Sequence, residues 1–78
     1  MTEITKTNAT ELDLEEMRQL IGFADCQDWN LTGGLSVQGV LDIYHASSKY
    51  ISIGDWLYDD PQAEKEFNAI HEKFKAAA

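Results

Sequence analysis

Residues 50–61 have the sequence Tyr50-Ile51-Ser52-Ile53-Gly54-Asp55-Trp56-Leu57-Tyr58-Asp59-Asp60-Pro61, and six large apolar or half-apolar side chains occupy the first nine positions. The stretch ends at a helix-start signal, Asp60 followed by Pro61. An aspartate there accepts free backbone N–H groups of the first turn, and a proline gives up no donor that the helix needs. An aromatic segment therefore leads directly into a predicted helix.

The residues after Pro61 indicate an amphipathic helix over residues 62–75. Phe67, Ile70 and Phe74 follow one another at spacings of three and four, which places them on one side of a helix. This apolar side needs a partner surface elsewhere in the chain.

The chain has 78 residues, which is enough for one domain with one core. A chain of this size hides only about 60% of the surface that its unfolded form exposes. Its hydrophobic content of 44% nevertheless exceeds the range typical of disordered chains. We predict a disordered tail over residues 1–9 and a single small acidic domain over residues 10–78, which folds alone or as a homodimer that shares a core.

Cys26 is the single cysteine, so no internal disulfide can form, and a reducing compartment is expected. No charged-then-apolar leader opens the sequence, and no apolar run approaches the ~18 residues of a membrane span. These features predict a cytoplasmic protein without a membrane partner.

The formal net charge is −8, and the acidic residues gather toward the two ends of the chain. Residues 1–30 contain seven acids and two bases, residues 31–54 contain one of each, and residues 55–78 contain six acids and three bases. Such a field repels nucleic acid and favours basic partners. Moderate acidity that merely keeps a small protein soluble is the simpler interpretation.

A first helix is predicted over residues 11–26. Asp13 and Glu16 have the spacing of a capping box, in which each side chain accepts the other residue's backbone N–H, and Thr10 with Asp13 is a second candidate start. Apolar residues then recur at helical spacing; they are Leu14, Met17, Leu20, Ile21 and Ala24. Gly22 interrupts this pattern at a cost of about 1 kcal/mol relative to alanine, which suggests close packing at that position.

The centre of the chain, residues 35–45, fits two interpretations. Alternating apolar residues, β-branched content and nearby glycines favour a strand with a bulge at Gly39, followed by a returning strand at residues 50–53. A helical stripe capped by Ser36 is the alternative. The expected fold class is therefore α+β: an N-terminal helix, two or three short antiparallel strands and a C-terminal helix.

The all-helical alternative has a helix–turn–helix-like centre. Residues 37–45 and 49–57 then form two helices, and the ending Trp56-Leu57-Tyr58-Asp59-Asp60-Pro61 resembles the closing residues of helix–turn–helix domains of some phages and transposons. This resemblance implies a DNA-reading regulator. The second helix, however, offers a single base, Lys49, where phosphate contacts normally require several.

Catalytic and cofactor signatures are not apparent in the sequence. Cys26, His45 and His71 do not belong to a recognisable nucleophile–base or zinc pattern, and no phosphate-binding glycine motif occurs. Asp55, Asp59 and Asp60 do not match the ligand spacing of a calcium loop. We expect a non-enzymatic protein without a metal or a cofactor.

Protein binding remains as the leading hypothesis. Acidic residues around aromatic anchors favour association with a basic surface, and carboxylates along helices can imitate the phosphates of a DNA duplex. By size and charge, the chain is comparable to the small acidic inhibitors that phages and plasmids encode against nucleic-acid-handling host enzymes. An accessory subunit of a larger complex is a further alternative. The predicted partner-binding residues are Glu11, Asp13, Glu15, Glu16, Asp55, Trp56, Tyr58, Asp59, Asp60, Glu64 and Glu66.

Overall fold

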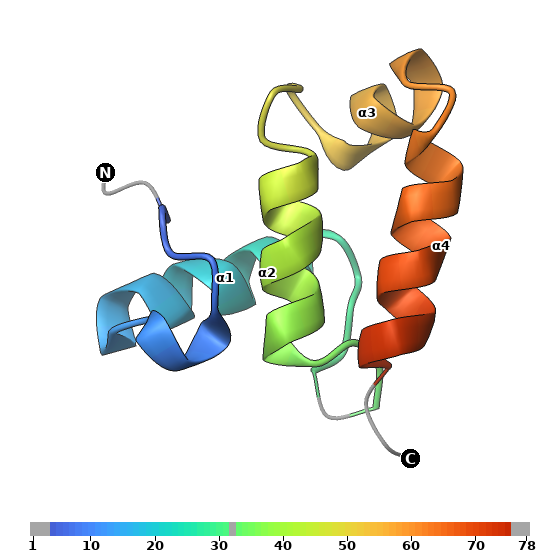
Figure 1. The fold of residues 1–78 in the computed structure, drawn as a ribbon. Coiled ribbons are helices and arrows are strands. Elements are labelled where there is room, and N and C mark those ends of the chain that lie inside the picture. Colours follow the sequence, from blue (N-terminus) through green and yellow to red (C-terminus); the bar gives the residue numbers. More distant parts are fainter. Residues whose placement is uncertain (1–3, 32, 76–78) are drawn as a thin grey trace.

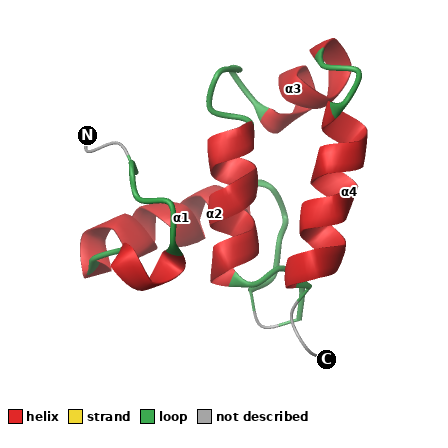
Figure 2. Ribbon diagram, in the orientation of Figure 1, coloured by secondary structure: helices red, strands yellow, loops and turns green. Residues whose placement is uncertain are grey.

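The computed structural model describes residues 4–31 and 33–75, which form a small all-helical domain (Figures 1 and 2). Its elements are a 3-10 turn η1 (Ala9–Glu11) and the helices α1 (Leu14–Cys26), α2 (Val37–Ala46), α3 (Ile53–Asp59) and α4 (Ala63–Phe74). Within the described ranges the extended pairing is limited to one isolated antiparallel bridge between Leu35 and Lys75. The predicted α+β fold with two or three antiparallel strands is therefore wrong.

The error lies in the centre of the chain, where the predicted strand is the helix α2. Ser36 caps it, since its hydroxyl oxygen accepts the backbone N–H of Gly39 at 3.2 Å. The helix packs on η1, α1 and α4, and its buried residues extend around about half of its circumference. Because so wide an arc is buried, apolar residues occur at the spacings of three and four typical of a helix and also at the spacing of two typical of a strand. The sequence pattern therefore resembled a strand.

The predicted returning strand at residues 50–53 is wrong for a related reason. Residues 47–52 form turns and bends, and Ser52 then caps α3 by accepting the backbone N–H of Asp55 at 3.2 Å. Ile53 and Trp56 are buried while the residues between them are exposed, so the aromatic stretch is a short helix with one inward side.

The helices α2 and α4 run antiparallel and side by side (Figure 1). A Cβ atom at Gly39 would lie 2.6 Å from the Cβ of Phe74 and 2.7 Å from the Cγ of Leu35, closer than real Cβ contacts allow. The backbone N–H of Ser36 donates to the carbonyl of Phe74 at 2.8 Å. Gly39 is therefore not a bulge residue; it lets the two helices approach closely.

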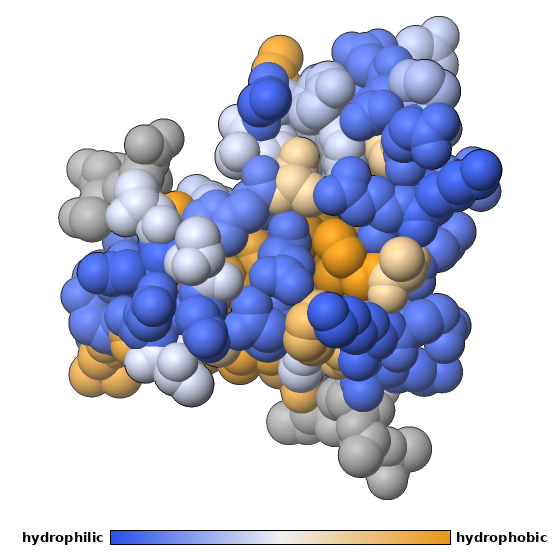
Figure 3. Space-filling view, in the orientation of Figure 1, coloured by the Kyte–Doolittle hydropathy of each residue, from blue (hydrophilic) through white to orange (hydrophobic). Residues whose placement is uncertain are grey.

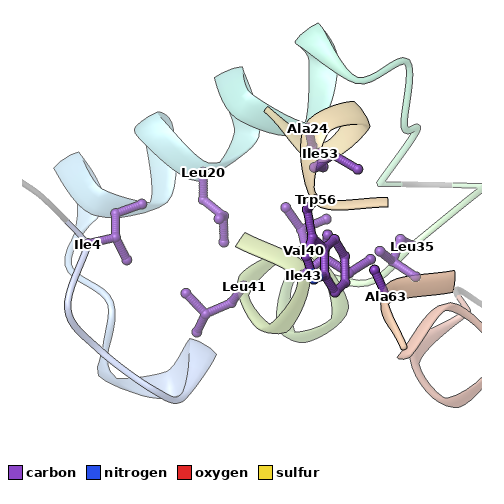
Figure 4. Packing of buried hydrophobic residues seen from close by; sticks show 10 residues of the cluster. All are labelled: Ile4, Leu20, Ala24, Leu35, Val40, Leu41, Ile43, Ile53, Trp56 and Ala63. Atoms are coloured by element: carbon purple, nitrogen blue, oxygen red, sulfur yellow. The ribbon is translucent and has the colours of Figure 1, made fainter. Parts of the chain in front are cut away.

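The core lies between α1, α2 and the α3–α4 pair, and Figure 4 shows its buried members. They are Ile4, Leu20, Ala24, Leu35, Val40, Leu41, Ile43, Ile53, Trp56 and Ala63. Aromatic contacts extend it: the ring of Phe67 lies 6.4 Å from that of Trp56 and 5.9 Å from that of Trp29, centroid to centroid. Phe67, Ile70 and Phe74 all pack against this core, which confirms the predicted stripe of the last helix.

The N-terminal segment follows the side of α2. Residues 1–3 of the predicted tail lie outside the described residues. Ile4 is buried in the core, and His45 Nε2 is hydrogen-bonded to the carbonyl of Lys6. The backbone N–H of Ala9 donates to Gln38 Oε1 at 2.7 Å. These contacts connect residues 4–9 to the start and the end of α2.

Candidate functional site

The predicted acidic residues form two groups at opposite ends of the molecule (Figure 1). One group lies on η1 and the start of α1: Glu11, Asp13, Glu15 and Glu16. The other lies on α3 and the start of α4: Asp55, Asp59, Asp60, Glu64 and Glu66. Since α1 packs on α2 whereas α3 packs on α4, the fold does not bring the two groups into one continuous row.

Half of the first group serves the start of α1. Asp13 Oδ1 accepts the backbone N–H of Glu16 at 2.8 Å, and Glu16 Oε1 accepts that of Asp13 at 3.2 Å. This is the predicted capping box, and Glu16 is buried within it. Only Glu11 and Glu15 are exposed and have no role in the cap. This end of the molecule therefore presents few carboxylates to a partner.

The second group surrounds an exposed aromatic residue on α3. Tyr58 is 90% exposed, and successive positions in a helix are about 100° apart. Tyr58 therefore points away from Ile53 and Trp56, with Asp55 about 60° and Asp59 about 100° from it around the helix axis, both in the same direction. Both aspartates are exposed. We call Asp55, Tyr58 and Asp59 the α3 outer face.

The two charges on this face affect the helix differently. Asp55 lies in the first turn of α3, where the helix dipole favours an acid. Asp59 lies in the last turn, where the dipole favours cations, and it is four residues from Asp55, a spacing at which like charges destabilise a helix by about 0.2–0.5 kcal/mol. The stability of α3 therefore accounts for Asp55 and gives no reason for Asp59.

The remaining predicted residues of this end differ in their positions. Trp56 is only 1% exposed and packs in the core, so it does not contribute to the surface. Asp60 is half-buried, and its Oδ1 accepts the backbone N–H of Gln62 at 2.9 Å in the turn before α4. Glu64 and Glu66 are exposed in the first turn of α4. Because they are two positions apart, they point to different sides of α4, and the exposed Lys65 lies between them in the sequence.

Two exposed apolar side chains near this surface were not predicted. Ile51 is 97% exposed and Leu57 is 36% exposed. Had residues 53–59 been recognised as a helix, its angular spacing would have placed Tyr58 outward and Trp56 inward.

Throughout residues 4–31 and 33–75, no acidic side chain forms an ion pair with a lysine, arginine or histidine. The carboxylates at this end are therefore not held in ion pairs within the described residues, and the nearest base in the sequence is Lys65, between Glu64 and Glu66.

A hollow of about 670 Å³ lies between the N-terminal segment, the end of α2 and the turn before α3. Two of its serine hydroxyls are already engaged: that of Ser47 donates to the carbonyl of Ile43, and that of Ser48 donates to the carbonyl of His45. His45 itself bonds the carbonyl of Lys6. This hollow therefore lacks the nucleophile–base contact that covalent catalysis requires.

The part of the chain that the structure describes holds no group of three or more His, Cys, Asp or Glu residues placed to bind a metal ion. None of the helices in this part combines the length and the apolar character that crossing a membrane requires. Comparison of the chain with protein-family models, with curated proteins and with solved structures finds no significant match.

Proposed function

We propose that the protein is a non-enzymatic binding module whose α3 outer face engages a basic surface on another protein. The observation that carries this proposal is the 90% exposure of Tyr58 next to two exposed aspartates that form no ion pair. A nucleic-acid-handling enzyme is the expected partner, because its substrate site is basic and the carboxylates would occupy it in place of phosphates.

The chemistry of the face suits such a contact. Tyrosine is enriched at interface hot spots, because its ring buries a large area while its hydroxyl still finds a hydrogen-bond partner. Carboxylates around such an anchor accelerate association with a basic surface and disfavour acidic ones. The local cost of placing Asp55 and Asp59 four residues apart is offset when both meet cations of the partner.

Direct DNA reading is not supported by the charges of α3. This helix follows α2 in the position of the second helix of a helix–turn–helix unit, but it contains two aspartates and no lysine or arginine. Phosphate contacts require basic side chains, and Lys49 in the preceding turn is alone in that region.

The test compares two variants with the same change of charge. Tyr58→Ala/Asp55→Asn/Asp59→Asn alters the α3 outer face, whereas Glu11→Gln/Glu15→Gln alters exposed acids at the opposite end. Each variant and the wild-type protein serve as bait in a pull-down from a cell lysate, at low and at high salt. Duplex DNA is added as a competitor in a parallel experiment. We expect basic nucleic-acid-binding proteins to be retained at low salt by the wild-type and Glu11→Gln/Glu15→Gln proteins, and to be released by salt or by DNA.

The α3 variant should lose at least about 90% of this retention, since it lacks both the anchor and two charges. Retention that is insensitive to salt, or equal for the α3 variant and the wild type, would contradict the proposal. Circular dichroism of both variants verifies that each remains folded.

A further inference from the structure

One side of α1 faces away from the domain. Leu20 and Ala24 are fully buried on the inner side, and Leu41 of α2 lies opposite Leu20 (Figure 4). The outer side contains an exposed stripe in which each residue is three, four or seven positions from another. Its members are Leu14, Arg18, Ile21, Gly22 and Asp25, all exposed. We call this stripe the α1 outer face.

The apolar residues of the α1 outer face are unusually accessible. Leu14 is 69% exposed and Ile21 is 38% exposed. In Figure 3 apolar atoms are visible at the lower left edge of the molecule, below the start of α1 in the same orientation in Figure 1. A helix at the surface of a monomer normally places polar residues on this side.

Gly22 lies in the middle of this face, and the chain itself offers no reason for it. A Cβ atom there would meet nothing within 4 Å. A glycine inside a helix costs about 1 kcal/mol relative to alanine. Close approach of a second backbone from outside is the condition under which such a glycine is favourable.

A hollow of about 530 Å³ lies at the C-terminal end of the same face. It is lined by Ile21, Asp25, Asp28, Trp29, Asn30 and Leu31. Leu14, the most exposed apolar side chain of α1, projects from the opposite end of the helix. A projecting side chain and a hollow at opposite ends of one face match each other when two copies of the helix pack antiparallel.

The charges of the α1 outer face match in the same arrangement. Arg18 and Asp25 are seven residues apart, and neither forms an ion pair within the described chain. In an antiparallel pair that sets Arg18 of one copy opposite Asp25 of the other, the symmetry forms the same contact twice. That register also places Ile21 opposite Gly22 of the second copy. It brings Leu14 of each copy to the hollow at the C-terminal end of α1 in the other copy.

From these features we infer that the α1 outer face is a homodimer interface, with a second copy of this chain packed antiparallel along α1 about a twofold axis. A twofold interface uses the same patch on both copies, so the patch must be self-complementary. The α1 outer face meets this requirement in shape, through Leu14 and the hollow, and in charge through the two Arg18–Asp25 contacts, which must outweigh the repulsion between Glu15 and Asp28 that the same register brings together at the edge. This inference is independent of the function proposed for the α3 outer face.

The interface is small, because it consists of one 13-residue helix and the turn that follows it. Contacts below the standard size of about 1,200–2,000 Å² are typical of weak and transient association. We therefore expect a dissociation constant in the range of about 10 μM to 1 mM. The dimer should form and dissociate reversibly with concentration.

Sedimentation equilibrium from about 10 μM to 1 mM tests the assembly. The wild-type protein should approach twice the 8.8 kDa mass of one chain as its concentration rises. Arg18→Glu and Asp25→Arg each place like charges opposite one another, which should weaken the dimer at least about tenfold. Lys49→Glu, a charge reversal of the same size in the turn after α2, should leave the dimer unchanged.

The decisive measurement combines the two charge reversals. Mixing the Arg18→Glu protein with the Asp25→Arg protein places opposite charges at both contacts, so the mixture should form heterodimers with about wild-type affinity. The Arg18→Glu/Asp25→Arg double variant should likewise recover homodimers. A wild-type protein that remains monomeric at about 1 mM, or a mixture that is no tighter than its components, would overturn the proposal.

Discussion

The contact between α2 and α4 and the outer face of α1 each contain a glycine inside a helix, but the surroundings of the two glycines are opposite. Gly39 is buried, and a Cβ atom there would collide with Phe74 and Leu35. Gly22 is exposed, and a Cβ atom there would meet nothing within 4 Å. The domain's own packing accounts for the first glycine and not for the second.

The two glycines cannot be told apart in the sequence, because each simply weakens a helix, but the structure shows that they have different causes. A residue that weakens a helix is explained when another part of the same chain requires it, as Phe74 requires Gly39. When no part of the chain requires it, the explanation lies outside the chain. Gly22 and Asp59 belong to this second kind, and they lie on the two faces to which we assign partners.

The largest expected effect on stability comes from comparing two leucine truncations, one at the buried inner side of α1 and one at its exposed outer side. Leu41→Ala removes a fully buried side chain of α2 near Leu20, which should reduce the free energy of unfolding by about 2–5 kcal/mol. Leu14→Ala, on the outer face, should change it by less than about 0.5 kcal/mol in dilute solution. Urea unfolding followed by circular dichroism measures both, and equal losses would invalidate the division into an inner and an outer side.

Gly39→Ala should reduce the free energy of unfolding by about 1–3 kcal/mol. Leu35 can adjust, but the Cβ of Phe74 is fixed to the α4 backbone, so α2 and α4 must move apart. This loss exceeds the gain in helical propensity of about 1 kcal/mol. A Gly39→Ala protein as stable as the wild type would show that the two helices do not approach as closely as described.

Gly22→Ala should have the opposite sign. Because nothing lies within reach of the new methyl group, the free energy of unfolding should increase by up to about 1 kcal/mol in dilute solution. The measurement is the same urea titration, at a concentration where the chain is monomeric. A destabilised Gly22→Ala monomer would mean that Gly22 is already packed within its own domain.

The two end helices could be predicted because their signals are local. The capping box of Asp13 and Glu16 involves atoms within one turn, and it is present as predicted. The stripe of Phe67, Ile70 and Phe74 needed only a single partner surface, so its period remained clear. The α2 segment was assigned wrongly because it is covered by elements on several sides, and short apolar runs do not distinguish a strand from a buried helix.

The candidate site was predictable only in part. Sequence reasoning named Asp55, Tyr58 and Asp59, but it grouped them with Trp56, which is buried, and with Glu16, which serves a helix cap. Ile51 was not identified, since exposure depends on what packs nearby. The prediction of a basic protein partner rests on charge and stays a prediction.

The amino-acid sequence by itself determined the capped start of the first helix, the apolar stripe of the last helix, the net charge of −8 and the absence of an internal disulfide. It did not determine the start of the last helix, which begins at Ala63 and not directly after Asp60. The tertiary structure decided that residues 37–46 are helical, which glycine is needed inside the domain and which carboxylates share a surface. The physical reason is the range of the interactions involved. Caps and helical stripes depend on neighbours a few residues away, whereas burial and surface grouping depend on contacts between segments that are distant in the chain.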